Sequence, residues 1–102
     1  MKVRFTPTAL EEHFETIKYI RQKNPKAAWE YLEHVEKILK RLELFPNSGR
    51  LLPEYPNTGY QEVIIPPNRY IYLIEGDTVW VSTVWHEKQQ LGLESDKPTI
   101  PM

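Results

Sequence analysis

Two helical segments joined by a single Asn-Pro step constrain the fold of this chain more than any other feature. Between residues 25 and 44, apolar side chains recur every three or four positions, which is the spacing of one helical face. Charged side chains take the opposite positions, so the pattern predicts an amphipathic helix that ends near Leu44. The apolar positions are Ala28, Tyr31, Leu32, Val35, Leu39 and Leu42.

Another helix is predicted upstream, from Thr8 to about Lys23. Thr6 followed by Pro7 is typical of a helix start, because threonine caps the first turn and proline suits the first helical position. The Asn-Pro step at 24–25 ends this helix, since the residue before a proline is disfavoured in helical conformation. The same step can begin the next helix, so the two must fold back as a hairpin. The expected apolar stripe of the first helix is Leu10, Phe14, Ile17 and Ile20.

The other elements are predicted to be strands. Residues 2–6 alternate charged and apolar side chains, as a half-buried strand does. Segments 60–65, 68–74 and 78–85 are short and rich in β-branched and aromatic residues. The proline-rich and glycine-containing stretch 45–59 is predicted to be a loop. The order strand, helix, helix and three antiparallel strands predicts an α+β fold, with both helices packed on one face of a small sheet.

The composition narrows the classes of function. The chain has 102 residues, the size of one domain; we assign residues 1–91 to it and residues 92–102, which lack periodicity, to a flexible tail. No apolar stretch approaches the roughly 20 residues of a membrane span, and no signal peptide is evident, so we expect a cytoplasmic protein without membrane contact. A net charge of −1 lacks the basic excess typical of nucleic-acid-binding domains.

No cofactor or metal site is predicted. Cysteine is absent, which excludes disulfides, thiolate metal sites and cysteine nucleophiles. His13 and His34 fall on different helices without ligand spacing, and we expect both on the helix surface. The glycine-containing segments lack the spacing of a phosphate-binding loop.

The last two predicted strands suit a hairpin closed by Gly76-Asp77, because glycine can take the positive φ that a two-residue turn requires. In that register Arg69 pairs with Val84, which makes Arg69 and His86 diagonal neighbours on one face, about 7 to 8 Å apart. The two side chains can share a site only if the turn has two residues rather than three. The alternative is that they are ordinary polar ends of two strands.

Four segments in order along the chain form a recognisable set. They are the Asn24-Pro25-x-Ala27-Ala28 helix start, Leu44-Phe45-Pro46 with Gly49-Arg50, the segment Arg69-Tyr70-Ile71-Tyr72, and a final strand ending at His86. This set, over about residues 2–91, resembles the RelE/ParE superfamily of toxins from type II toxin-antitoxin pairs. The resemblance implies a protein that inhibits growth when free. It also implies a partner, a cognate antitoxin whose C-terminal segment wraps over the toxin.

The superfamily divides by mechanism. RelE-like members enter the ribosomal A site and cut mRNA without a metal, whereas ParE-like members bind DNA gyrase and trap its cleaved complex. The nuclease chemistry needs a base, an acid and a cation near one phosphate. The YoeB-like branch resembles this chain in having a loop glutamate, a strand arginine and a late histidine. These match Glu54 as base, Arg69 as phosphate clamp and His86 as acid, with Arg50 or Lys88 as further phosphate contacts.

Departures from the nuclease pattern favour the gyrase branch. Position 61 is glutamine where many members have arginine, and segment 87–91 lacks the usual basic pair. A mildly acidic chain is also poorly suited to the phosphate-rich ribosome. The ParE-like function is therefore favoured, and the mRNA endonuclease is the alternative. A third alternative is an inactive peptide-binding domain of this fold, with Trp29 as an exposed anchor for a partner peptide. For Trp29 itself, packing against the first helix is the favoured expectation.

Overall fold

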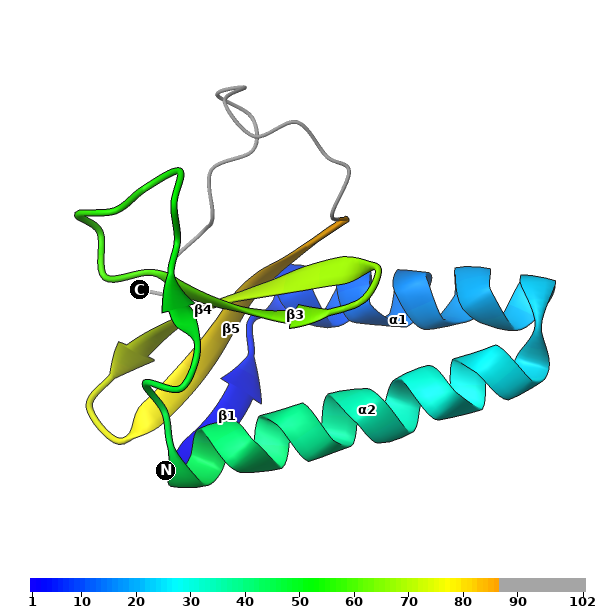
Figure 1. Ribbon diagram of the computed structural model, residues 1–102, viewed down its shortest axis with the longest axis horizontal. Helices are drawn as coiled ribbons and strands as arrows, with labels where there is room; N and C mark the ends of the chain where they lie inside the picture. Colours follow the sequence, from blue (N-terminus) through cyan, green and yellow to red (C-terminus); the bar gives the residue numbers. More distant parts are fainter. Residues whose placement is uncertain (87–102) are drawn as a thin grey trace.

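A computed structural model describes residues 1–86 of the chain. Figure 1 shows the two helices running side by side along one layer of a twisted sheet, so the predicted α+β arrangement is confirmed. The predicted domain end at residue 91 and the predicted tail, residues 92–102, lie outside the described residues. The elements are β1 (Lys2–Phe5), α1 (Pro7–Lys23), α2 (Pro25–Leu44), β2 (Arg50–Leu51), β3 (Gln61–Ile65), β4 (Asn68–Glu75) and β5 (Thr78–His86).

Both helices begin where the sequence predicts, and for the predicted reason. The Thr6 hydroxyl accepts a hydrogen bond from the Ala9 amide at 3.1 Å, which caps α1. The Asn24 side chain accepts hydrogen bonds from the amides of Lys26 and Ala27 at 3.1 and 3.2 Å, which caps α2. Asn24 is extended and is the one residue between the helices, so the predicted hairpin is confirmed. Within residues 1–86, neither helix is long and apolar enough to span a membrane.

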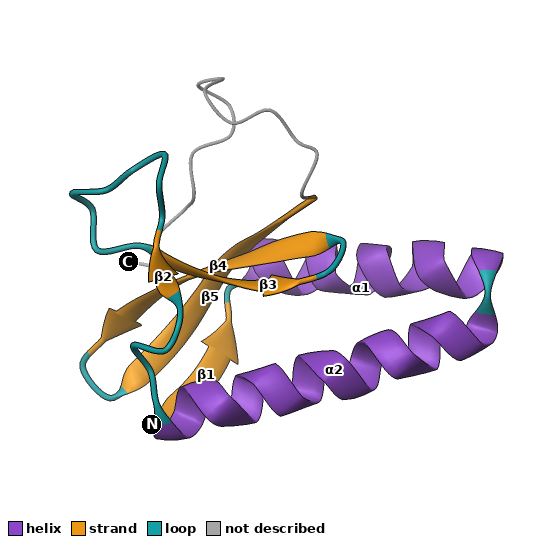
Figure 2. Cartoon of the chain, viewed as in Figure 1, coloured by secondary structure: helices purple, strands orange, loops and turns teal. Residues whose placement is uncertain are grey.

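The sheet has the strand order β1-β5-β4-β3-β2 (Figure 2). Strands β3, β4 and β5 form an antiparallel meander, and β1 lies parallel to β5 at one edge. The segment predicted to be a loop, 45–59, contains the two-residue strand β2. This strand pairs with β3 through Arg50 opposite Glu62 and Leu51 opposite Gln61. That pairing brings the loop carrying Glu54 to the edge of the sheet.

The main core lies between the helices and the sheet and contains Val35 and Leu42 of α2 with Tyr70 and Tyr72 of β4. The apolar stripe predicted for α1 is partly wrong, because Leu10 and Phe14 are 41% and 58% exposed. Ala9 and His13 face the core in their place, at 0% and 8% exposure. The expected surface position of His13 is therefore also wrong, whereas His34 is exposed.

A chain of hydrogen bonds explains how a histidine can be buried here. His13 Nδ1 lies 2.8 Å from the Tyr70 hydroxyl, which lies 2.7 Å from the Tyr31 hydroxyl. The Asn68 side-chain amide donates to Tyr31 at 3.1 Å. Buried polar groups are tolerated when they are hydrogen-bonded, so these four side chains tie α1, α2 and β4 together inside the core.

Protonation of His13 should make stability depend on pH. Burial lowers the pKa of His13 below its usual value of 6.5. Below pH 6.5 the unfolded chain binds a proton at this residue while the folded chain resists it. The free energy of unfolding should therefore decrease as the pH falls below that value, and should gain nothing further from His13 above it.

Urea denaturation at about pH 8 and about pH 5.5 would measure this effect against the variant His13→Gln. The loss of stability on acidification should be smaller in the variant than in the parent. The titratable groups facing His13 are the Tyr70 hydroxyl from β4 and, in the hollow shared with α2, Glu33 and Glu36. These carboxylates attract a charged imidazole and so oppose the effect. Equal pH dependence in both proteins would contradict the prediction.

Gly49 permits a close contact between the loop and the sheet. Its amide donates to the Tyr72 hydroxyl at 3.1 Å, and that hydroxyl donates to the Pro46 carbonyl at 2.8 Å. A Cβ at position 49 would lie 2.5 Å from the Glu62 carbonyl oxygen and 2.6 Å from the Tyr72 hydroxyl. The loop 45–59 can therefore pack this closely against β3 only with glycine at position 49.

Replacing Gly49 with alanine should destabilise the protein by about 1 to 3 kcal/mol, the usual cost of an overpacked contact. The midpoint of thermal unfolding should fall accordingly. The variant Ser48→Ala is the matched control, since Ser48 is exposed and its backbone hydrogen bond to Phe45 would remain. An unchanged midpoint for Gly49→Ala would mean that the loop accommodates the methyl group.

Candidate functional site

The hairpin between β4 and β5 closes with the predicted two-residue turn. Glu75 pairs with Thr78 across Gly76-Asp77, and Gly76 takes a positive φ of 60°. The predicted pairing of Ile74 with Val79 is also present. Near the turn, the register is therefore the one expected from the sequence.

A β-bulge changes the register further from the turn. Tyr72 lies opposite Val81, but the preceding residue of β4, Ile71, lies opposite Thr83, so Ser82 is an additional residue in β5. Arg69 consequently pairs with Trp85, and the predicted pairing of Arg69 with Val84 is wrong.

The bulge places Arg69 and His86 on opposite faces of the sheet. The Arg69 guanidinium lies 5.8 Å from the centre of the Trp85 ring, on the face away from the helices. His86 pairs with Asn68, whose side chain reaches Tyr31 on the helix side. One inserted residue inverts the alternation of side chains, so the prediction that Arg69 and His86 share a site is wrong.

Arg69 is held by two carboxylates. Its Nη1 and Nη2 donate to the two Glu54 oxygens at 3.0 and 2.8 Å, which is a bidentate pair. Its Nε donates to Glu62 Oε1 at 2.6 Å. Glu62 also accepts a hydrogen bond from Nε of Arg50. Two arginines and two glutamates therefore form one ion-pair cluster, made of Arg50, Glu54, Glu62 and Arg69.

The charges of this cluster stabilise one another. The hydrogen bonds from Arg69 lower the pKa of Glu54, and the hydrogen bond to Glu54 is the main cause that raises the pKa of Arg69. Glu62 is only 1% exposed, and its carboxylate is tolerated inside the protein because it accepts hydrogen bonds from the two arginines. Glu54 is thereby a weak base, and Arg69 can bind a phosphate bidentately only after Glu54 has moved away. Sequence reasoning missed Glu62, although a carboxylate directly before the apolar residues 63–65 of a predicted strand was a signal.

The ordered set of segments is matched by a family comparison. A family model described as the ParE toxin of the type II toxin-antitoxin system parDE matches residues 3–91. The chain belongs to this toxin family. Its fold is similar to a solved chain entitled "Chromosomal ParDE TA system from P. aeruginosa", with a TM-score of 0.70 and 14% sequence identity. The similarity covers 84% of this chain and 95% of that one. No curated protein sequence matches the chain.

Arg50 is the other predicted site residue of the toxin that the ion-pair cluster contains. Arg50 lies on the edge strand β2 with its side chain 67% exposed. Trp29 is 67% exposed, so the favoured expectation that it packs against α1 is wrong. Its role as a partner anchor stays a prediction. Lys88 lies outside the described residues.

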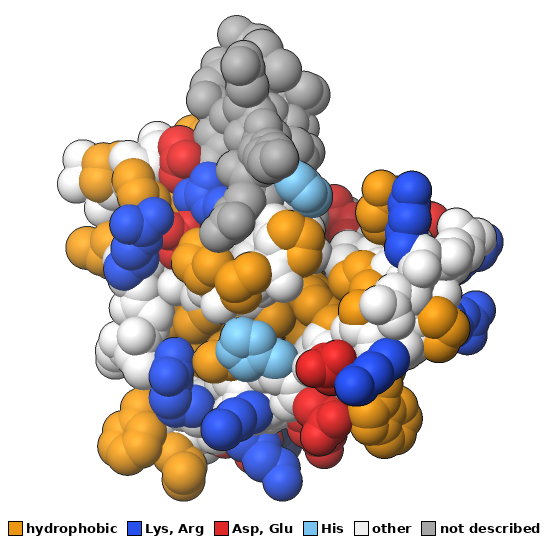
Figure 3. Space-filling model, turned by 45° about the vertical axis from the view of Figure 1, so that its right-hand side comes forward, with side chains coloured by type: hydrophobic (Ala, Val, Ile, Leu, Met, Phe, Trp, Pro, Cys, Tyr) orange, Lys and Arg blue, Asp and Glu red, His pale blue; other side chains and the backbone are white. Residues whose placement is uncertain are grey.

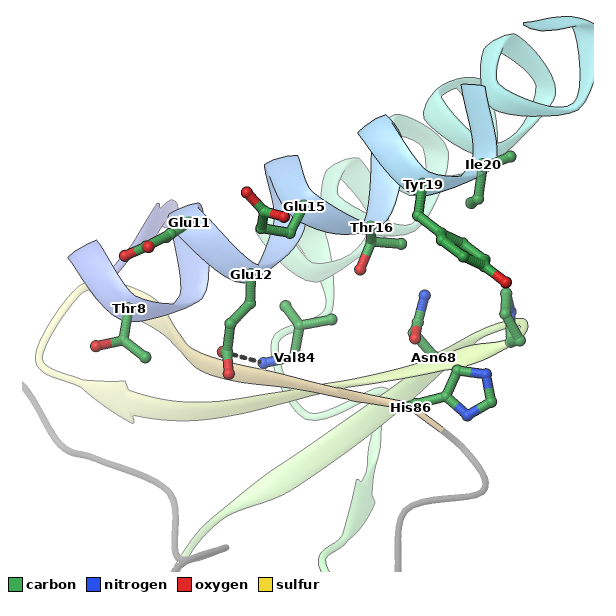
Figure 4. A pocket seen from close by; sticks show the side chains of 11 residues that line it. Thr8, Glu11, Glu12, Glu15, Thr16, Tyr19, Ile20, Asn68, Val84 and His86 are labelled. Atoms are coloured by element: carbon green, nitrogen blue, oxygen red, sulfur yellow. Dashed lines mark hydrogen bonds between the residues drawn. The ribbon is translucent and has the colours of Figure 1, made fainter. Parts of the chain in front are cut away.

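His86 of the toxin lies at a groove between α1 and the ends of β4 and β5 (Figure 4). The groove has a volume of about 470 Å³, and three glutamates of α1 line it together with Asn68. One of them, Glu12, accepts hydrogen bonds from the Val84 amide at 2.9 Å and from the Thr83 hydroxyl at 2.8 Å. No lysine or arginine among residues 1–86 lines this groove, which therefore disfavours a phosphate.

Proposed function

We propose that this toxin is a ParE-like poison of DNA gyrase that traps the cleaved gyrase complex, and that a cognate antitoxin holds it inactive. The main support for the proposal is that the Arg69 guanidinium is already bound by Glu54 and Glu62, on the face of the sheet opposite His86. A toxin that acts by binding a partner surface needs no assembled base, acid and cation. We expect it in the cytoplasm, where both possible targets are found.

The nuclease alternative would require this ion-pair cluster to open. Separating a buried charge from its partner costs about 3 to 5 kcal/mol, and phosphate binding would have to offset that cost. His86 would still lie on the other side of the sheet, in a groove lined by Glu11, Glu12 and Glu15. Phosphoryl chemistry places its acid and its cation on the same phosphate. The geometry of the described residues therefore favours the gyrase function over mRNA cleavage.

The decisive experiment compares the two targets directly. Purified toxin is incubated with gyrase and supercoiled plasmid, and the reaction is stopped with detergent and protease, which releases trapped breaks as linear DNA. In parallel, the toxin is incubated with ribosomes programmed with mRNA, and new RNA ends are mapped. We expect linear plasmid, no cleavage of the mRNA, and suppression of the plasmid breaks by the antitoxin.

The variant His86→Ala distinguishes the remaining outcomes. His86 is exposed at the end of β5, so its substitution tests the proposed acid without removing a core side chain. Cleavage of mRNA by the parent protein but not by this variant would overturn the proposal in favour of the endonuclease. Absence of both activities, together with normal growth during expression, would instead indicate an inactive peptide-binding domain.

A further inference from the structure

A groove runs along the C-terminal half of α2 and shares no lining residue with the groove at His86. It has a volume of about 500 Å³. Figure 3 shows Lys and Arg side chains gathered over the lower part of this face, with hydrophobic side chains at the lower left. We call this groove along α2 the basic groove. It is lined by His34, Lys37, Ile38, Lys40, Arg41, Leu44 and Phe45.

The lining of the basic groove contains three cationic side chains and no carboxylate. No ion pair within 4.0 Å among residues 1–86 involves Lys37, Lys40 or Arg41. The neighbouring glutamates of α2, Glu33 and Glu36, line a separate hollow on the side of α2 that faces His13. Glu30 lines another hollow together with His34. The glutamates of α2 therefore lie beside the basic groove, whose own charged lining is cationic.

Two large apolar side chains lie beside these cations. Leu44 and Phe45 are 75% and 64% exposed, at the end of α2. A large exposed apolar pair beside charged groups is typical of an interaction site.

The backbone under the basic groove is held in place. The Phe45 amide donates to the Arg41 carbonyl at 2.7 Å, and the Phe45 carbonyl accepts from the Ser48 amide at 3.0 Å. Leu42, on the opposite side of the same turn, is fully buried in the core. The surface is therefore preorganised, which lowers the entropic cost of binding a partner.

We propose that the basic groove docks an acidic segment of a protein partner. Carboxylates of that segment would contact Lys37, Lys40 and Arg41, and its apolar side chains would cover Leu44 and Phe45. Nucleic acid is the other polyanion to consider. A net charge of −1 gives the chain no long-range attraction for nucleic acid. The apolar side chains at the end of the groove also cannot form ion pairs with phosphates. This inference does not depend on whether gyrase is the target.

The test uses the full chain and a fluorescent synthetic peptide that combines glutamate and leucine at helical spacing. Fluorescence anisotropy should detect its binding, and replacing the glutamates with glutamine should weaken that binding. The double variant Lys37→Glu/Arg41→Glu should bind the acidic peptide at least about tenfold more weakly, because attraction becomes repulsion. The variant Leu44→Ser/Phe45→Ser should also bind it more weakly.

The matched control is Lys18→Glu/Arg21→Glu, which makes the same charge change at exposed positions of α1 that do not line the groove. This control should bind the peptide as the parent does, and circular dichroism should show every variant folded. Equal weakening in both double variants would overturn the proposal, because it would indicate attraction to charge in general. Undetectable binding of the acidic peptide by the parent would also overturn it. A single-stranded oligonucleotide that binds more tightly and displaces the peptide would assign the groove to nucleic acid instead.

Discussion

Replacing Arg69 with alanine should lower the free energy of unfolding by about 3 to 5 kcal/mol, because the variant leaves a buried carboxylate without its main partner. The side chain of Glu62 is 0% exposed and that of Arg69 is 9% exposed, so neither charge is screened by water. Urea denaturation followed by circular dichroism measures the loss.

Arg50 provides the control for this experiment within the same cluster. It also bonds to Glu62, but its side chain is 67% exposed. Removing an exposed partner of an ion pair usually costs about 0 to 1 kcal/mol, so Arg50→Ala should be much milder than Arg69→Ala. Equal losses for the two arginines would contradict the distinction between a buried and an exposed charge.

This prediction also affects how toxicity data are read. Because Arg69 joins β4 to Glu54 in the loop, an Arg69→Ala protein that has lost toxicity has first lost stability. Loss of toxicity in that variant is therefore no evidence of a catalytic arginine. The variant His86→Ala, with its exposed histidine at the end of β5, is the more informative probe of nuclease chemistry.

Tyr70→Phe should give the second large effect. The lost hydroxyl lies between His13 Nδ1 at 2.8 Å and the Tyr31 hydroxyl at 2.7 Å, and Tyr70 is 0% exposed. Each buried polar group left without its partner costs about 1 to 3 kcal/mol, and this substitution affects two of them. We therefore expect a loss of about 2 kcal/mol or more in the free energy of unfolding, measured by urea denaturation near neutral pH.

Tyr19→Phe is the matched control, because it removes the same hydroxyl from a side chain that is 62% exposed. Its stability should change by less than about 0.5 kcal/mol. If Tyr70→Phe were equally mild, the hydrogen-bond chain from His13 to Asn68 would contribute little to the core.

Features that depend on adjacent residues were predictable from the sequence. The caps at Thr6 and Asn24 and the turn at Gly76-Asp77 occur where the sequence places them. Their geometry depends on the φ and ψ angles of one or two residues and on hydrogen bonds that reach a few positions along the chain. The same local signals predicted the order of the elements and hence the α+β fold.

Which side chains meet in space was decided only by the tertiary structure. The bulge at Ser82 shifts the register of β5 by one residue and moves His86 to the face opposite Arg69. Arg69 instead meets Glu54 and Glu62, which come from the loop and from β3. A strand register is set by pairing between distant segments, and one additional residue exchanges the two faces. The sequence alone therefore determined the helices and strands of this toxin except β2, whereas the tertiary structure decided which charges face one another.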